Sequence, residues 1–150
     1  MKIFVSSDHA GFELRKSLVT LLRTRGIDVN DLGPETAEPR DYPDEAVRVA
    51  RRVQAEPQAR GVLVCGSGVG MCIAANKVAG IRAVDAWNDE VARLSRAHND
   101  TNVLCLGARV LSVAEAESIL NIWLATTFDG GRHAGRVAKI SEIESKELTP

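Results

Sequence analysis

Segments typical of strands and helices alternate along the whole chain, and this alternation is the feature that most limits its fold. Short apolar runs occupy residues 2–6, 27–32, 61–65, 81–86 and 102–106, and helical patterns lie between them. Strands that alternate with helices form a parallel sheet, because each helix carries the chain back across one face of the sheet. The pattern predicts an α/β, Rossmann-like three-layer sandwich with a five-stranded parallel sheet.

The helical segments show apolar residues at the spacing of one helix face, and several have recognisable ends. Leu14, Leu18 and Leu22 recur in this way in the first helix, which Gly26 should end. Asn88 and Ser112 are suitable N-caps for later helices. The last helix has less apolar surface, which favours packing on another subunit. The predicted helices span residues 11–25, 42–56, 69–77, 88–98, 112–126 and 137–147.

Length and composition suit one globular domain over residues 1–150, since 45% of the residues are hydrophobic. A net charge of −1 and only 4% aromatic residues argue against a nucleic-acid partner. No apolar run reaches the length of a membrane span, and the start of the chain lacks the pattern of a secretion signal. The three cysteines form no paired framework. We therefore expect a cytoplasmic protein without membrane or nucleic-acid partners.

A glycine-rich loop, Cys65-Gly66-Ser67-Gly68-Val69-Gly70, directly follows the strand predicted at residues 61–65. Glycines let the backbone approach a ligand closely and point successive N–H groups at an anion. Cys65 would lie beside this loop and next to the start of the following helix, whose positive end favours a thiolate. The loop therefore predicts a reactive thiol next to an anion-binding backbone.

Other polar residues could join this thiol in one site. Asp8 and His9 follow the first strand, and the carboxyl ends of parallel strands meet at one edge of the sheet. Asp8 is equally suited to cap the helix that follows it. His98 and Asn99 end a later helix, where an imidazole can move protons, although a single histidine is commonly structural.

Three arginines are candidate phosphate ligands. Arg132 and Arg136 are four residues apart, so a helical backbone would place both guanidinium groups on one side. Two planar forks suit a phosphate dianion, and Arg109 after the fifth strand could supply a third cation. Solvated arginines at this spacing are also common, so both interpretations stay open.

A nucleotide site is a competing interpretation of the same loop. Gly66-x-Gly68 follows a strand, and Asp85 ends the next strand at about the distance expected of a ribose-binding acid. The match is incomplete, because Met71 stands where the dinucleotide fingerprint needs a third small residue. The first strand also leads into polar residues instead of glycines.

The remaining cysteines give no sign of a metal site. Cys72 falls on the helix after the glycine loop and Cys105 within a buried strand, so both should pack as small apolar residues. No two cysteines have C-x-x-C spacing, and the histidines are scattered along the sequence. We predict no structural metal.

Seven short motifs, spread over nearly the whole chain, together identify a family. They are DHAG at 8–11, DYP at 41–43, CGSGVG at 65–70, AANK at 74–77, GIRA at 80–83, HNDTN at 98–102 and GGRH at 130–133. The combination closely resembles the type B ribose-5-phosphate isomerases. That family also contains galactose-6-phosphate isomerase subunits and enzymes that act on allose or tetrose phosphates.

The resemblance implies a metal-independent, cofactor-free isomerase that interconverts ribose 5-phosphate and ribulose 5-phosphate through an enediolate. It implies a homodimer, in some members assembled into a tetramer, with active sites at the interface and built from both chains. The C-terminal helix would then be used in dimerisation. Another phosphosugar (allose 6-phosphate, galactose 6-phosphate or a tetrose phosphate) remains an alternative substrate, and a noncatalytic nucleotide- or phosphosugar-binding module is a second alternative.

By motif match, Cys65 corresponds to the catalytic base and His98 to the residue that aids ring opening, with possible help from Asp8. Ser67 could relay a proton between O1 and O2. One branch of the family uses an acid further along the loop, where this chain has Met71 or Cys72. The resemblance implies these substrate-binding residues: His9, Tyr42, Gly66, Gly68, Val69, Gly70, Asn99 and Arg109, with Arg132 and Arg136 as phosphate ligands.

Overall fold

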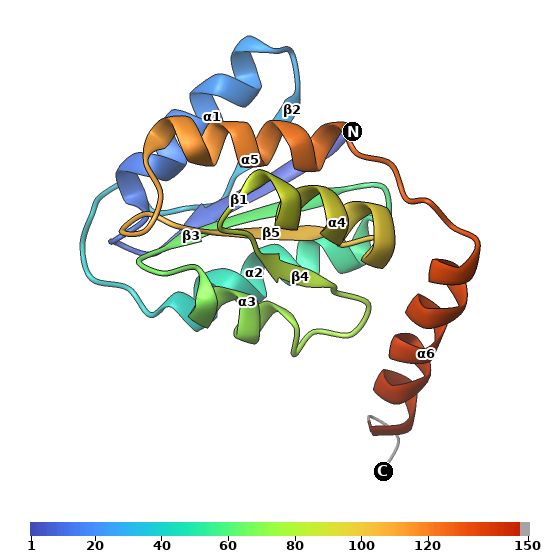
Figure 1. Ribbon diagram of the computed structural model, residues 1–150. Coiled ribbons are helices and arrows are strands. Elements are labelled where there is room, and N and C mark those ends of the chain that lie inside the picture. Colours follow the sequence, from blue (N-terminus) through green and yellow to red (C-terminus); the bar gives the residue numbers. More distant parts are fainter. Residues whose placement is uncertain (148–150) are drawn as a thin grey trace.

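The computed structural model describes residues 1–147 and contains the predicted parallel sheet (Figure 1). Its strand order is β2-β1-β3-β5-β4, and all neighbouring strands are parallel. The α/β prediction is therefore confirmed. The strands are β1 (Lys2–Ser7), β2 (Asp28–Asp31), β3 (Arg60–Cys65), β4 (Ala83–Asp85) and β5 (Val103–Gly107).

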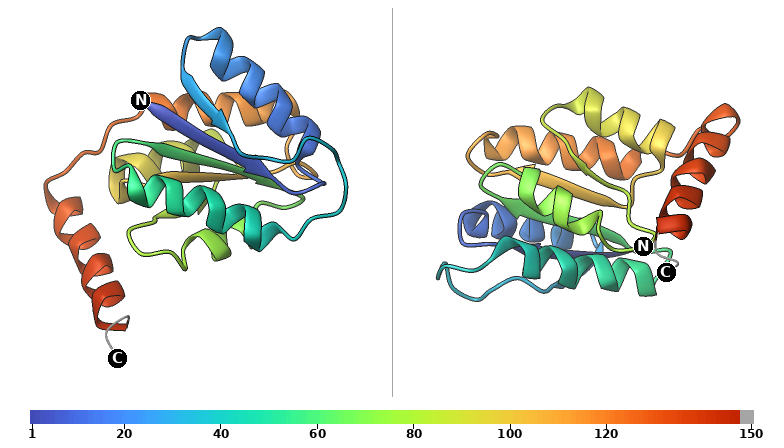
Figure 2. Two further views of the ribbon diagram at one scale, coloured as in Figure 1. Left: turned by 180° about the vertical axis from the view of Figure 1, so that it is seen from behind. Right: turned by 90° about the horizontal axis from the view of Figure 1, so that it is seen from below.

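Helices cover both faces of the sheet, as a three-layer sandwich requires (Figures 1 and 2). One core cluster joins the sheet to α1 (Phe12–Thr24), α4 (Asp89–Asn99) and α5 (Val113–Ala125). A second joins the opposite face to α2 (Tyr42–Ala55) and α3 (Val69–Ala75). Because the central strands are covered on both sides, β5 is apolar at nearly every position and fully buried.

The last helix, α6 (Arg132–Glu147), stands apart from these layers and contacts the body mainly through α4 (Figures 1 and 2). The Gly80 N–H donates to the Glu144 carboxylate at 2.9 Å, while Ile140 and Ile143 remain exposed. A cavity of about 640 Å³ lies between α6 and the body, with Ile140, Ile143, Ile81 and Asn99 among its lining residues. The helix therefore leaves much of its apolar surface uncovered within one chain.

Most element boundaries differ from the prediction by one or two residues, and the start of the last helix differs by five. The fourth strand was expected over residues 81–86 but spans only Ala83–Asp85, because its register with β5 covers three residues. The last helix was expected at 137–147 but starts at Arg132, directly after a turn in which Gly130 and Gly131 both have positive φ. This earlier start places Arg132 and Arg136 one helical turn apart.

The sheet has two distinct edges that position polar side chains. The loops after β1, β3, β4 and β5 all lie at its carboxyl edge, while the end of α4 and the start of α6 lie at its amino edge (Figure 1). Ligands of open α/β sheets bind at the carboxyl edge. Among residues 1–147, no helix combines the length and apolarity that crossing a bilayer requires.

Candidate active site

Cys65 is the last residue of β3, and its side chain turns toward the glycine loop. The residue is 4% exposed, and the Gly68 N–H donates to its Sγ at 3.1 Å. Gly68 has a φ of 85°, a conformation that favours glycine. A backbone donor thus stabilises negative charge on the sulfur.

The loop is held in place by the segment that follows β5. Ala108 donates its N–H to the Cys65 carbonyl at 2.8 Å, and Arg109 donates to the Gly66 carbonyl at 2.9 Å. These two bonds extend the β3–β5 pairing beyond the strands. The loop backbone is therefore fixed before any ligand binds.

Side chains from three other segments surround the loop. Asp8 is buried and accepts the Gly11 N–H at 3.0 Å. Gly11 is itself the N-cap of α1, so Asp8 holds the residue before the helix and is not its cap. The Arg109 guanidinium lies over Gly66, since a Cβ there would be 3.3 Å from its nitrogen. The Tyr42 ring likewise lies over Gly70, with a distance of 2.7 Å to such a Cβ.

The sequence-predicted residues at this edge form one group, which we call the loop site. Its members share the carboxyl edge of the sheet and flank the glycine loop, and both His9 and Ser67 are exposed there. The loop site comprises Asp8, His9, Tyr42, Cys65, Gly66, Ser67, Gly68, Val69, Gly70 and Arg109.

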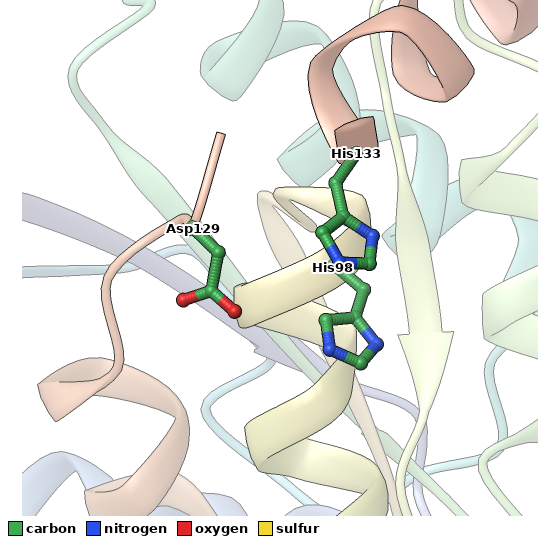
Figure 3. Close-up of side chains that lie close together, drawn as sticks. All are labelled: His98, Asp129 and His133. Carbon is green, nitrogen blue, oxygen red and sulfur yellow. The ribbon is translucent and has the colours of Figure 1, made fainter. Parts of the chain in front are cut away.

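A second group lies at the amino edge, where we define the histidine cluster as His98, Asp129 and His133 (Figure 3). The two imidazoles stack with ring centroids 4.1 Å apart and planes 4° from parallel. Asp129 is anchored to α4 by its N–H, which donates to the Ala97 carbonyl at 3.0 Å. Two histidines that lie far apart in the sequence are therefore neighbours in the fold.

The electrostatics of the histidine cluster favour an anion. Burial lowers the pKa of His133, and the neighbouring His98, Arg132 and Arg136 lower it further, while Asp129 acts in the opposite direction. The lowered pKa favours the neutral form of His133, and Arg132 and Arg136 keep positive charge close to it. This environment opposes a second positive charge and attracts a negative one.

A metal ion is a possible ligand by distance alone, because one donor atom from each of His98, Asp129 and His133 lies within 4.8 Å of the others. However, two parallel ring planes share no point, so one ion cannot lie in the plane of both imidazoles as coordination requires. The nearby arginines oppose a cation as well. The geometry of the two imidazoles therefore does not suit one shared metal ion.

The loop site and the histidine cluster are far apart within one chain. Residues Val103–Gly107 of β5 separate the two edges, and five strand residues span about 13 Å. Cys65 ends beside Gly107, while His98 and Asn99 precede Val103. The structure therefore does not bring His98, Asn99, Arg132 or Arg136 to Cys65 in the same subunit.

Sequence reasoning missed the part that Asp85 plays. Its carboxyl packs against Gly68, where an added Cβ would overlap Oδ1 and lie 2.8 Å from Cγ. Burial raises the pKa of Asp85 to about 6. No local pattern reveals this contact, and the only sequence signal was the position of Asp85 at a strand end.

We expect Asp85→Asn to stabilise the protein at neutral pH. The pKa of Asp85 is about 6 in the folded protein and 3.8 for the ordinary group. The unfolded chain therefore loses this proton at lower pH than the folded protein does, and the folded state loses stability as the pH rises from about 4 to about 6. The full shift corresponds to about 3 kcal/mol, and partial exposure reduces our expectation to about 1–2 kcal/mol. Urea unfolding at pH 7.5 should show this gain, and at pH 4 the gain should vanish.

The control for this measurement is Glu38→Gln, which removes an exposed acid from the loop before α2. It should leave the free energy of unfolding unchanged at both pH values. Equal stabilities of Asp85→Asn and wild type at pH 7.5 would contradict the expected cost of ionising Asp85 in the folded protein.

Comparison with known proteins identifies the family to which this fold and site belong. The Ribose/Galactose Isomerase family profile matches residues 3–140. The chain is 46% identical to ribose-5-phosphate isomerase B of Escherichia coli over 145 residues, 97% of each protein. It is 37% identical to the D-erythrulose-4-phosphate isomerase of Pectobacterium atrosepticum, with 98% of this chain and 97% of that protein covered.

Solved structures agree with these matches. Ribose-5-phosphate isomerase B of Clostridium thermocellum superposes with a TM-score of 0.96 at 48% identity, over 98% of this chain and 99% of that one. The Mycoplasma genitalium enzyme with bound ribulose-5-phosphate gives 0.94 at 41% identity, over 97% of each chain. Fold and matches together define a Rossmann-like sugar-phosphate isomerase. Within this class, the chain belongs to the ribose-5-phosphate isomerase B family.

Proposed function

We propose that the protein interconverts ribose 5-phosphate and ribulose 5-phosphate, with Cys65 as the base. The observation that carries this proposal is the Cys65 sulfur, which faces the loop amides at the carboxyl edge of the sheet. The E. coli relative has the name of this enzyme, and the M. genitalium structure holds the ketose product. The exchange of aldose and ketose requires a base that abstracts a proton and donors that stabilise the enediolate, and a sulfur beside fixed N–H donors can supply both.

The reaction moves one proton between neighbouring carbons. His98, helped by Asp8, opens the sugar ring. The Cys65 thiolate then removes the C2 proton and returns it to C1, while the N–H groups of residues 66–70 stabilise the enediolate oxygens. Ser67, exposed at the same loop, relays the remaining proton between O1 and O2.

We further propose that each active site joins the loop site of one subunit to the histidine cluster of its partner. A pentose phosphate cannot bridge the two groups within one chain, because the sheet lies between them. The uncovered apolar side of α6, with Ile140 and Ile143 exposed, provides surface for the second copy. The C-terminal helix would then take part in dimerisation.

In this arrangement Arg132 and Arg136 bind the phosphate. Both are exposed, one turn apart at the start of α6, and neither has a salt bridge within residues 1–147. His9 and Arg109 approach from the loop site. Asn99 and Tyr42 contact the sugar.

Arg132→Ala should reduce kcat/KM for ribose 5-phosphate about 10- to 100-fold, mainly through KM, because a charge-assisted contact to the phosphate is lost. Steady-state kinetics on phosphorylated and unphosphorylated ribose test this. Arg93→Ala, which removes an exposed arginine paired with Glu90, is the control and should change neither. An equal loss on both sugars would show that Arg132 does not act on the phosphate.

The substrate is tested with a panel of tetrose, pentose and hexose phosphates and detection of ketose product in excess chelator. We expect the highest kcat/KM for ribose 5-phosphate. The Pectobacterium relative is named for a tetrose phosphate, so a higher rate on that sugar would reassign the substrate within the same chemistry. Binding of phosphosugars without any turnover would instead support the noncatalytic alternative.

We also propose a cytoplasmic location. Cys65, Cys72 and Cys105 are all free, as expected of thiols in a reducing compartment. Cell fractionation would test this, and recovery outside the cytoplasm would contradict it.

A further inference from the structure

Asp85 contacts the glycine loop from β4, which is separated by β5 from the strand that supplies Cys65. It ends β4, where its Cα is paired with Cys105 of β5, and its carboxyl packs against Gly68. The same Gly68 donates its N–H to the Cys65 sulfur. One glycine therefore separates a carboxyl group from the proposed catalytic thiolate.

Among the residues that the structure describes, the carboxyl has no partner that would neutralise it. Within residues 1–147, no hydrogen bond and no ion pair reaches its oxygens. It borders a cavity of about 290 Å³ whose other walls are uncharged, with Ser67, Val69, Trp87 and Val110 among them. A carboxylate in such surroundings is poorly solvated, and a nearby negative charge makes it less favourable still.

We propose that Asp85 is a positioning residue for catalysis, whose neutral carboxyl permits the loop to stabilise negative charge and whose ionised form opposes it. This inference rests on the proposed isomerase chemistry. Both the Cys65 thiolate and the enediolate place negative charge at the loop that Asp85 contacts. In a partly buried site, a negative charge on Asp85 and a negative charge at the loop repel each other, because little water screens them. The neutral form of Asp85 is therefore the active one.

Few titratable groups face this carboxyl. The thiols of Cys72 on α3 and Cys105 on β5 interact with it electrostatically, and no arginine, lysine or histidine within residues 1–147 contributes to its raised pKa. The pKa of about 6 comes from burial alone. At pH 7 about one molecule in ten would therefore hold the neutral carboxyl.

The test compares kcat/KM of Asp85→Asn with wild type from pH 5 to pH 7.5. Asparagine keeps the shape and stays neutral, so the ratio of variant to wild type should rise from about 1 at pH 5 to about 10 at pH 7. Asp89→Asn, four residues later and exposed, should give a ratio near 1 throughout. A ratio for Asp85→Asn that does not change with pH would overturn the inference.

A second measurement does not depend on turnover. In the Cys72→Ser background, iodoacetamide should alkylate Cys65 several-fold faster in Asp85→Asn than in the Asp85 protein at pH 7, and equally fast at pH 5. Equal rates at both pH values would overturn the inference, whereas the expected rates in a protein without isomerase activity would overturn only the proposed function. If Asp85→Asn does not fold, Asp85→Leu supplies a second neutral side chain for both measurements.

Discussion

Replacing Cys65 with alanine is expected to lower kcat for the isomerase reaction by at least about 1,000-fold, since the variant has no base to remove the C2 proton. The loss should appear mainly in kcat, because the phosphate and hydroxyl contacts stay in place. The substitution removes a single sulfur atom from a nearly buried position, and we expect this to lower the free energy of unfolding by about 1 kcal/mol. Coupled detection of ribulose 5-phosphate, with the unfolding temperature measured in parallel, checks both expectations.

The matched control is Cys72→Ala, which removes a half-buried thiol seven residues later on α3. We expect its kcat to stay within about twofold of wild type, because no loop amide donates to this sulfur. A folded Cys65→Ala variant with near-wild-type turnover would show that another residue is the base. Of the two residues that could stand at the position of the alternative acid, Met71 is fully buried and has no ionisable group, and Cys72 is the residue that this control removes.

The features that sequence analysis predicted are those that topology determines. Alternating strands and helices require a parallel sheet, and a parallel sheet brings the residues after β1, β3 and β5 to one edge. The grouping of Asp8, Cys65 and Arg109 in the loop site follows from that rule. The family resemblance was confirmed by the profile match over residues 3–140, and two of its motifs, DHAG at 8–11 and CGSGVG at 65–70, follow β1 and β3 at this edge.

The features that were missed depend on contacts between distant elements. His98 and His133 are 35 positions apart in the sequence. They stack because the segment before α6 binds the end of α4 and because α6 starts at Arg132, five residues before the predicted start. The contact of Asp85 with Gly68 depends in the same way on how closely β4 approaches the loop. Helix periodicity and turn residues contain no information on either distance.

The separation of the loop site from the histidine cluster leads to the second large effect, which is complementation between two variants that are each impaired in activity. We expect His98→Ala to lose about 10- to 100-fold of the activity as ring opening slows. Mixed with Cys65→Ala under conditions that exchange subunits, it should recover about one quarter of wild-type activity. Half of randomly paired dimers are mixed, and each mixed dimer holds one site with both residues intact.

A site contained within one chain predicts the opposite result, because every chain in the mixture then lacks one of the two residues. Activity that stays at the level of the separate variants, in a mixture whose subunit exchange is verified by native mass spectrometry, would therefore place His98 and Cys65 in one subunit or remove His98 from the reaction. A mixture of Cys65→Ala with Ser67→Ala is the control. Both residues belong to the loop site, so no dimer of these chains regains a complete site and no recovery is expected.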